Sequence, residues 1–194
     1  MVKIAFTPII YRHPSPLAVI AQIVFADHCI KRGVPMYYRA FHSDALVERA
    51  RGRAATHFLL DTDYDVNLQV DDDIHFRAED AVAVCEQAES FDIVCGVYPT
   101  RHRTAAIPTS YLEPGSRIEF WTDDPTPVPI RWAGGGFLAV HRRVFERLSK
   151  DLPLCHSNDD LRHYPFYQTM VAEAGTEPVL LSEDWAFCER ARQA

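Results

Sequence analysis

Val66-Asn67-Leu68-Gln69-Val70-Asp71-Asp72-Asp73 is the stretch that decides the fold expected for this chain. Its first five residues predict a short strand, and the strand runs directly into three consecutive carboxylates. Open α/β sheets bind their ligands at the carboxyl ends of their strands. The stretch therefore predicts a strand of an α/β sheet with a ligand site at its edge.

Strands and helices alternate around this stretch. Residues 3–10 predict a first strand, and a helix over 17–32 follows it. Ser15 is a suitable N-cap for this helix, Pro16 suits its first position, and Gly33 suits its left-handed end. The alternation continues with a strand over 34–41, a helix over 44–59 capped by Ser43, a helix over 78–89 and a strand over 92–98. This order predicts a mostly parallel central sheet flanked by helices.

The second half of the chain is less regular. Residues 100–129 are rich in proline and predict loop, with room for one hairpin. Residues 130–141 predict two strands around a triple glycine, and residues 143–150 a short helix. Ser182 is expected to cap a last helix. With 194 residues and no linker or repeat, we expect a single domain over the whole chain.

The composition excludes several classes of protein. A net charge of -7 argues against binding to long stretches of nucleic acid, which needs a clustered basic surface. Five cysteines without a CxxC pair suggest neither a disulfide framework nor a zinc site. The apolar runs are too short for a signal peptide or a membrane span. We therefore expect a cytoplasmic protein.

The acidic run, Asp71-Asp72-Asp73, is the strongest chemical signal. Carboxylates packed this closely repel one another and need a cation or strong hydrogen-bond donors. Alternate residues of an extended segment point the same way, so Asp71 and Asp73 are expected to share one target. Oxygen ligands beside a phosphate suit Mg²⁺ or Mn²⁺. The alternative is a solvated acidic turn that caps the next helix.

Two further motifs carry weaker signals. Ser182-Glu183-Asp184-Trp185 places two acids in the first turn of a helix, where they could simply complement the helix dipole. The glycines in residues 132–137 remove side chains so that a ligand or backbone can approach closely, or else they form a tight turn. Neither motif alone separates these alternatives.

Together, in this order, the motifs resemble the GT-A glycosyltransferases, in particular short family-2-like members with a DxD motif. The resemblance covers most of the chain. It rests on residues 7–9, 48–51, 71–73, 94–99, 134–137, 144–146 and 182–188. It implies a Rossmann-like domain with a nucleotide-binding half over about 1–100 and an acceptor-binding half over about 101–194.

The resemblance implies a metal-dependent transferase that uses a nucleotide-diphosphate sugar, with a UDP- or GDP-sugar the expected donor. Asp71 and Asp73 would hold Mn²⁺ or Mg²⁺ against the diphosphate, directly or through water, and Asp72 or Asp71 would touch the nucleotide. Arg51 would lie near the diphosphate. The base and ribose pocket would be lined by Thr7, Pro8 and Ile9.

The same resemblance implies roles on the acceptor side. Asp184 would be the general base that takes the proton of an acceptor hydroxyl as it attacks the anomeric carbon, which leads to inversion. The sugar and the acceptor, whose identity the sequence leaves open, would contact Trp132, Gly134, Gly135, Gly136, Glu183 and Trp185.

The chain departs from the family pattern in three places, and one of them is the middle glycine, Gly135, where relatives often have Thr or Ser. Gly52 follows Arg51 where relatives often have Asn, which puts the nucleotide contact in doubt. Many relatives also supply a third metal ligand, usually His, from a strand beyond the last helix, whereas this sequence ends at Ala194. A truncated C-terminus, a substitute ligand (His156, His163 or a water molecule) or a weakly held metal would each account for this difference.

Two other functions stay open. Phosphatases of the haloacid dehalogenase class also place D-x-D after an apolar strand, and Asp71 would then be a phosphorylated nucleophile. In that class the motif ends the first strand, and Thr stands two places after its second Asp. Here the motif ends the third predicted strand, and His75 stands at the position of that Thr. The other alternative is a non-catalytic nucleotide-sugar-binding module.

Overall fold

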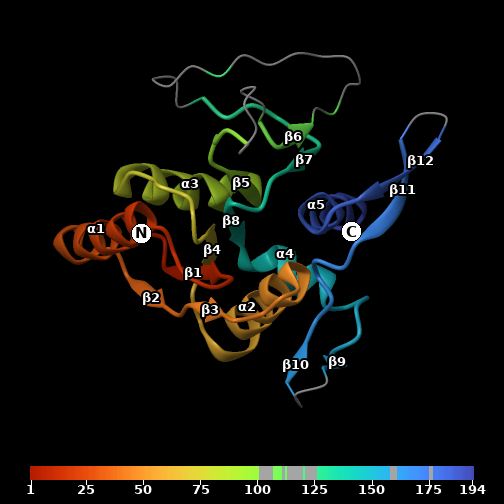
Figure 1. Ribbon diagram of the computed structural model, residues 1–194, viewed down its shortest axis with the longest axis horizontal. Coiled ribbons are helices and arrows are strands. Elements are labelled where there is room, and N and C mark those ends of the chain that lie inside the picture. Colours follow the sequence, from red (N-terminus) through yellow and green to blue (C-terminus); the bar gives the residue numbers. More distant parts are fainter. Residues whose placement is uncertain (101–106, 111, 113–119, 121–125, 158–160, 175–176) are drawn as a thin grey trace.

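The computed structural model describes residues 1–100, 107–110, 112, 120, 126–157, 161–174 and 177–194. Its central element is a mixed six-stranded sheet with the order β2-β1-β4-β8-β5, in which β3 also pairs with β1 (Figure 1). The strands are β1 (Ile4–Ile10), β2 (Met36–Tyr38), β3 (Phe41–His42), β4 (Val66–Asp71), β5 (Ile93–Cys95) and β8 (Phe137–His141). The predicted α/β class is confirmed.

The pairing of β4 explains why the sheet is mixed. On one side β4 pairs in parallel with β1, and Ile9 lies opposite Asp71. On its other side β4 pairs antiparallel with β8, which also pairs antiparallel with β5. The later β8 therefore enters between two strands that follow each other along the chain. The sheet is therefore mixed and not clearly the mostly parallel sheet that the sequence had predicted. Local patterns could not predict this, because the position of β8 depends on pairing between residues far apart in the chain.

Two layers of helices cover the sheet (Figure 1). On one face α1 (Pro16–Arg32) and α3 (Ala78–Phe91) pack through Phe25 and Cys85 onto Leu68 of β4. The other core contains side chains from α2 (Val47–Asp61), α4 (Arg142–Leu148) and α5 (Glu183–Gln193). Because strand side chains alternate, Asn67, Gln69 and Asp71 of β4 point away from the α1 and α3 face.

The first helix forms as its sequence predicts. Ser15 accepts a hydrogen bond from the backbone N–H of Ala18, Pro16 starts the helix, and Gly33 ends it with a φ of 68°. The second helix differs from its prediction. It starts at Val47, and Ser43 itself adopts a φ of 64°, a left-handed conformation outside the extended region of an N-cap residue.

Other element boundaries also differ from the predictions. Residues 34–41 form two short strands, β2 and β3, and only β5 forms from residues 92–98. The triple glycine does lie between β7 (Trp132–Ala133) and β8, and α4 follows directly. Additional short strands are β6 (Thr109–Ser110), β9 (Cys155–His156), β10 (Arg162–His163), β11 (Met170–Ala174) and β12 (Glu177–Leu181). Most of the expected loop over 100–129 lies outside the described residues.

A buried carboxylate joins α5 to β7. Glu189 is 2% exposed and accepts a hydrogen bond of 2.8 Å from Trp132 Nε1. Arg131 and Arg192 also donate to Glu189. Burial raises the pKa of Glu189, but the bonds from Arg192, Arg131 and Trp132 outweigh burial and lower it to about 2. Glu189 therefore stays ionised in the folded protein.

This carboxylate predicts a pH dependence of stability. Because the pKa of Glu189 falls from 4.5 to about 2 on folding, its stabilisation is complete above about pH 4.5 and is lost toward pH 2. We expect Glu189→Gln to lose less of its free energy of unfolding than the wild type between neutral pH and about pH 3. Urea unfolding at both pH values measures this, and equal acid losses would contradict it.

No helix among the described residues is long and apolar enough to cross a membrane.

Candidate functional site

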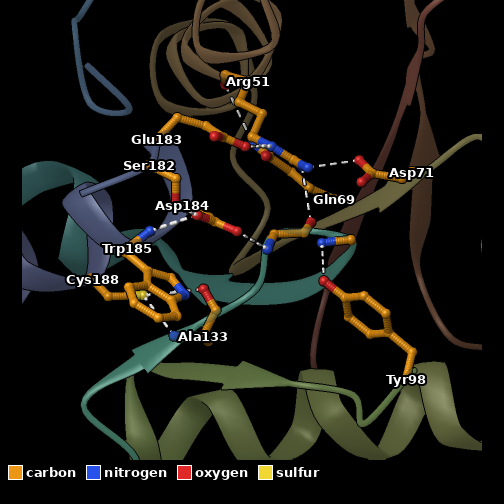
Figure 2. Close-up of polar contacts among 12 residues, drawn as sticks. Arg51, Gln69, Asp71, Tyr98, Ala133, Ser182, Glu183, Asp184, Trp185 and Cys188 are labelled. Carbon is orange, nitrogen blue, oxygen red and sulfur yellow. Dashed lines mark hydrogen bonds and ion pairs between the residues drawn. The ribbon is translucent and has the colours of Figure 1, made fainter. Parts of the chain in front are cut away.

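The candidate site lies where β4, the glycine turn after β7 and the first turn of α5 meet (Figure 2). Its centre is the side chain of Arg51 from α2, which is 2% exposed. Arg51 Nη2 donates to Asp71 Oδ1 at 2.7 Å, and Nε lies 3.6 Å from Glu183 Oε1. Nη1 donates to the carbonyl of Gly135 at 2.9 Å. One buried cation thus joins three segments.

The charges around Arg51 keep it protonated. Burial lowers the pKa of Arg51, but the carboxylates of Asp71 and Glu183 raise it, and the net shift is upward. Burial and the neighbouring Asp184 raise the pKa of Glu183, which Arg51 in part opposes. Acids outnumber the cation in this group, so the site has a negative excess that a second cation would neutralise.

Asp184 is held in one orientation. Its Oδ2 accepts a 3.0 Å hydrogen bond from the backbone N–H of Gly135. Its Oδ1 accepts from the N–H of Trp185 at 2.8 Å and from the hydroxyl of Ser182. Ser182 is the N-cap residue of α5 by position, but its hydroxyl donates to Asp184. The first turn of α5 therefore fixes this carboxylate beside the glycine turn.

The three glycines are required by packing inside the protein. A Cβ on Gly135 would lie 2.8 Å from Arg51 Cζ, and one on Gly136 would lie 2.8 Å from the Tyr98 ring. One on Gly134 would lie 2.4 Å from the Tyr98 hydroxyl. That hydroxyl accepts a 2.8 Å hydrogen bond from the N–H of Gly136. Side chains of the protein thus occupy the space that we expected a sugar or an acceptor to use.

Two polar residues of the site, Gln69 and Tyr98, were not predicted from the sequence. Gln69 Nε2 donates to the carbonyl of Arg51 at 3.3 Å and to Asn67 Oδ1 at 3.1 Å. Burial raises the pKa of Tyr98, so it stays a neutral phenol beside the glycines. Buried amides in an apolar strand need hydrogen-bond partners. The two amides at alternate positions, Asn67 and Gln69, could therefore have indicated from the sequence that one face of β4 is polar.

The acidic run leaves the strand after its first residue. β4 ends at Asp71, and the N–H of Ile74 donates to the carbonyl of Asp71 at 3.2 Å, which closes a turn. Asp73 therefore lies on a turn, outside the extended segment in which alternate side chains such as Asp71 and Asp73 were expected to point the same way. Asp72 Oδ2 accepts from the N–H of Tyr11 at 2.9 Å. Among the described residues, no group of three or more His, Cys, Asp and Glu could hold a metal ion.

The remaining predicted site residues are mostly buried. Thr7, Pro8 and Ile9 lie within β1, and Thr7 accepts a hydrogen bond from Asn67 Nδ2. Trp132 is 6% exposed and stacks on Trp185 with ring centroids 4.8 Å apart. A surface cavity of about 430 Å³ lies instead just beyond β1, lined by Tyr11, Arg12, His13, Ser43 and Ala45. The residues of β1 are therefore mostly buried, whereas the residues that follow β1 line the surface cavity.

Comparisons with known proteins give limited information. No protein-family model matches the chain, and no curated protein has a significant match to it. Among solved structures, A197 from STIV has a TM-score of 0.49 and 22% identity, over 76% of this chain and 68% of A197. A glycosyltransferase involved in the glycosylation of the major capsid of PBCV-1 has a TM-score of 0.27 and 14% identity, over 74% of this chain and 62% of that one. Neither likeness carries a functional argument.

Proposed function

We propose that this protein is a metal-dependent glycosyltransferase of the GT-A type that moves a sugar from a nucleotide-diphosphate sugar to an acceptor hydroxyl with inversion. One observation carries the proposal. Asp71 at the end of β4 and the neighbouring Glu183 and Asp184 in the first turn of α5 come from two distant segments and gather around the buried Arg51. Carboxylates of a single turn that only cap a helix would not converge in this way.

The donor chemistry of the acidic run fits a divalent cation. Mg²⁺ binds through one or two carboxylates together with substrate phosphates, so a complete cage of protein ligands is not required. Asp71 is 33% exposed at its side chain, and Asp73 is exposed on the turn that follows. We propose that Asp71 and Asp73 hold Mn²⁺ or Mg²⁺. When bound, the metal would act as a Lewis acid that stabilises the charge of the leaving diphosphate.

Arg51 has a different role in this proposal from the diphosphate contact that the resemblance implied. It is buried and already donates to Asp71 and Gly135. We therefore assign it to positioning: Arg51 holds Asp71 at the strand end and links it to Glu183 and the glycine turn. The nucleotide would occupy the cavity beyond β1. This cavity lies next to Asp72, whose carboxylate accepts a hydrogen bond from the backbone N–H of Tyr11.

Asp184 is proposed as the general base. The N–H groups of Gly135 and Trp185 fix its carboxylate, which limits the reorganisation needed when it accepts a proton. It would take the proton of the acceptor hydroxyl as the oxygen forms its bond to the anomeric carbon and the bond to the diphosphate breaks. Attack from the face opposite the leaving group inverts the configuration.

A thermal-shift panel tests the donor and the metal together. In a panel of UDP-, GDP-, TDP- and CMP-sugars, we expect one of the three diphosphate sugars to stabilise the protein only with Mn²⁺, by about 2.7 kcal/mol at a hundredfold excess over Kd. The shift should disappear in Asp73→Ala, because the metal loses a ligand. It should persist in Asp151→Ala, which removes an exposed acid in the turn after α4.

Turnover assays separate the remaining functions. Release of nucleoside diphosphate from the stabilising sugar nucleotide supports the transferase. Release of inorganic phosphate from a phosphomonoester would support the phosphatase, and tight binding without turnover would support a binding module. If no nucleotide changes the melting temperature with or without Mn²⁺, the proposed donor is wrong.

A further inference from the structure

Three hydrogen-bonded side chains lie at the β2 edge of the sheet, outside the candidate site. β2 ends the strand order beside β1, and α2 packs against β3, which follows β2 along the chain (Figure 1). The hydroxyl of Tyr37 on β2 lies 2.8 Å from Nε2 of His57 on α2. Nδ1 of the same ring lies 2.7 Å from Oδ2 of Asp61, one turn later on α2. A hydroxyl, an imidazole and a carboxylate are thus in contact in that order.

The carboxylate decides the direction of these hydrogen bonds. An ionised carboxylate can only accept, so Nδ1 of His57 carries a hydrogen and donates it to Asp61. In the neutral ring Nε2 then has a free lone pair, and it accepts from the hydroxyl of Tyr37. This is the order of a nucleophile, its base and a group that orients the base. The imidazole can therefore take the proton of Tyr37 as the Tyr37 oxygen attacks an electrophile.

Arg39 adds a positive charge to this cluster. Its Nη1 lies 3.1 Å from Nδ1 and 3.2 Å from Nε2 of His57. An atom in the ring plane at such similar distances from both nitrogens would overlap with the carbon between them, so Arg39 lies over the face of the ring. The Nε2 lone pair, which lies in the ring plane, therefore stays available to Tyr37. The guanidinium is close enough to stabilise an oxyanion that forms on a group attached to Tyr37.

We propose that Tyr37 is a nucleophile that accepts an acyl group from an uncharged, activated ester, with His57 as its base and Asp61 as a positioning residue. The Tyr37 oxygen forms a bond to the carbonyl carbon of the ester, and its proton passes to Nε2. The bond between that carbon and the leaving group breaks, and the leaving group takes the proton from His57. The products are an acyl ester of Tyr37 and the free alcohol of the leaving group.

Charge favours an acyl donor over a phosphoryl donor. A phosphoryl donor brings several negative charges, which need several cations. The chain adds two more acids directly after Asp61, namely Asp63 and Asp65, and Lys3 already pairs with Asp63 at 2.9 Å. Arg39 supplies one cation to the cluster, which matches the single oxyanion that forms during acyl transfer.

The neighbouring tyrosine on β2 provides an internal control. Tyr38 is 48% exposed, and its hydroxyl donates to the amide oxygen of Gln22 at 3.1 Å. Tyr37 is less exposed, but it donates to an imidazole. With p-nitrophenyl acetate at neutral pH, we expect acetylation of Tyr37 to be at least about tenfold faster than that of Tyr38, because an amide cannot act as a base. Peptide mass spectrometry measures the acetyl group on each tyrosine over time.

Two variants test the base and its orientation. His57→Gln keeps an acceptor for the Tyr37 hydroxyl but cannot take a proton, so acetylation of Tyr37 should fall to the rate of Tyr38. Asp61→Asn, at a side chain that is 63% exposed, should lower the rate by a smaller factor. His28→Gln is the matched control: His28 of α1 lies 3.6 Å from Glu79 of α3, so Tyr37 should react as in the wild type.

The rate at Tyr38 separates loss of the base from loss of the fold. If Tyr38 reacts faster in His57→Gln than in the wild type, this variant has unfolded, and Asp61→Asn alone then decides. Equal wild-type rates at Tyr37 and Tyr38, or a Tyr37 rate that neither variant lowers, would overturn the proposal and leave only a structural link between α2 and β2. These measurements do not depend on sugar transfer at the candidate site.

Discussion

Asp184→Asn is expected to lower the turnover of the proposed transferase by about 10²- to 10⁴-fold, the usual contribution of a general base. Asn has nearly the same shape but cannot take a proton, and its one oxygen can accept from only one of the two N–H groups, since Gly135 donates to Oδ2 and Trp185 to Oδ1 of Asp184. Binding of the donor should change little, and a small loss of stability is expected from the N–H group left without its acceptor. Release of nucleoside diphosphate under saturating donor and acceptor measures the effect.

The neighbouring acid provides the matched control. Glu183 contacts Arg51 at 3.6 Å, so we place it in the positioning network and expect Glu183→Gln to cost less turnover than Asp184→Asn. Asp151→Asn, at an exposed position, should have no effect. If Glu183→Gln abolishes turnover while Asp184→Asn retains it, the base is Glu183 and our assignment is wrong.

Arg51→Met is expected to destabilise the fold by about 3–5 kcal/mol, the cost of removing one partner of a buried ion pair. The substitution leaves Asp71 and Glu183 without their common cation and frees the carbonyl of Gly135 inside the protein. Urea unfolding at neutral pH measures the loss. Arg77→Met is the control: the Arg77–Asp80 pair is exposed, so its loss should change the unfolding midpoint little.

The cause of this loss can be tested in two further ways. Adding Glu183→Gln to Arg51→Met should recover part of the stability, because one uncompensated carboxylate becomes neutral. Lowering the pH should also reduce the loss, because burial and Asp184 already raise the folded pKa of Glu183, and an acid with a raised pKa favours the folded state as the pH falls. A loss independent of both changes would show that Arg51 stabilises the protein by packing alone.

Several elements could be predicted because short-range chemistry decides them. Ser15, Pro16 and Gly33 each act on backbone groups within four residues of themselves, so the bounds of α1 follow from its own sequence. The end of β4 at the acidic run also depends on residues that are close in sequence. The same is true of the glycine turn between β7 and β8. Boundaries failed where the pattern was ambiguous, as at Ser43, which could have been a cap or a left-handed turn residue.

The sequence by itself determined which residues carry charge, where the main helices form, and that Asp71 and Asp184 stand at the ends of regular elements. The tertiary structure alone decided that β8 enters the sheet antiparallel and that Arg51 meets Asp71, Gly135 and Glu183. The reason is distance along the chain. Gly135 is 84 residues from Arg51, and no local propensity selects such a pair; the pairing of strands and the burial of one cation select it.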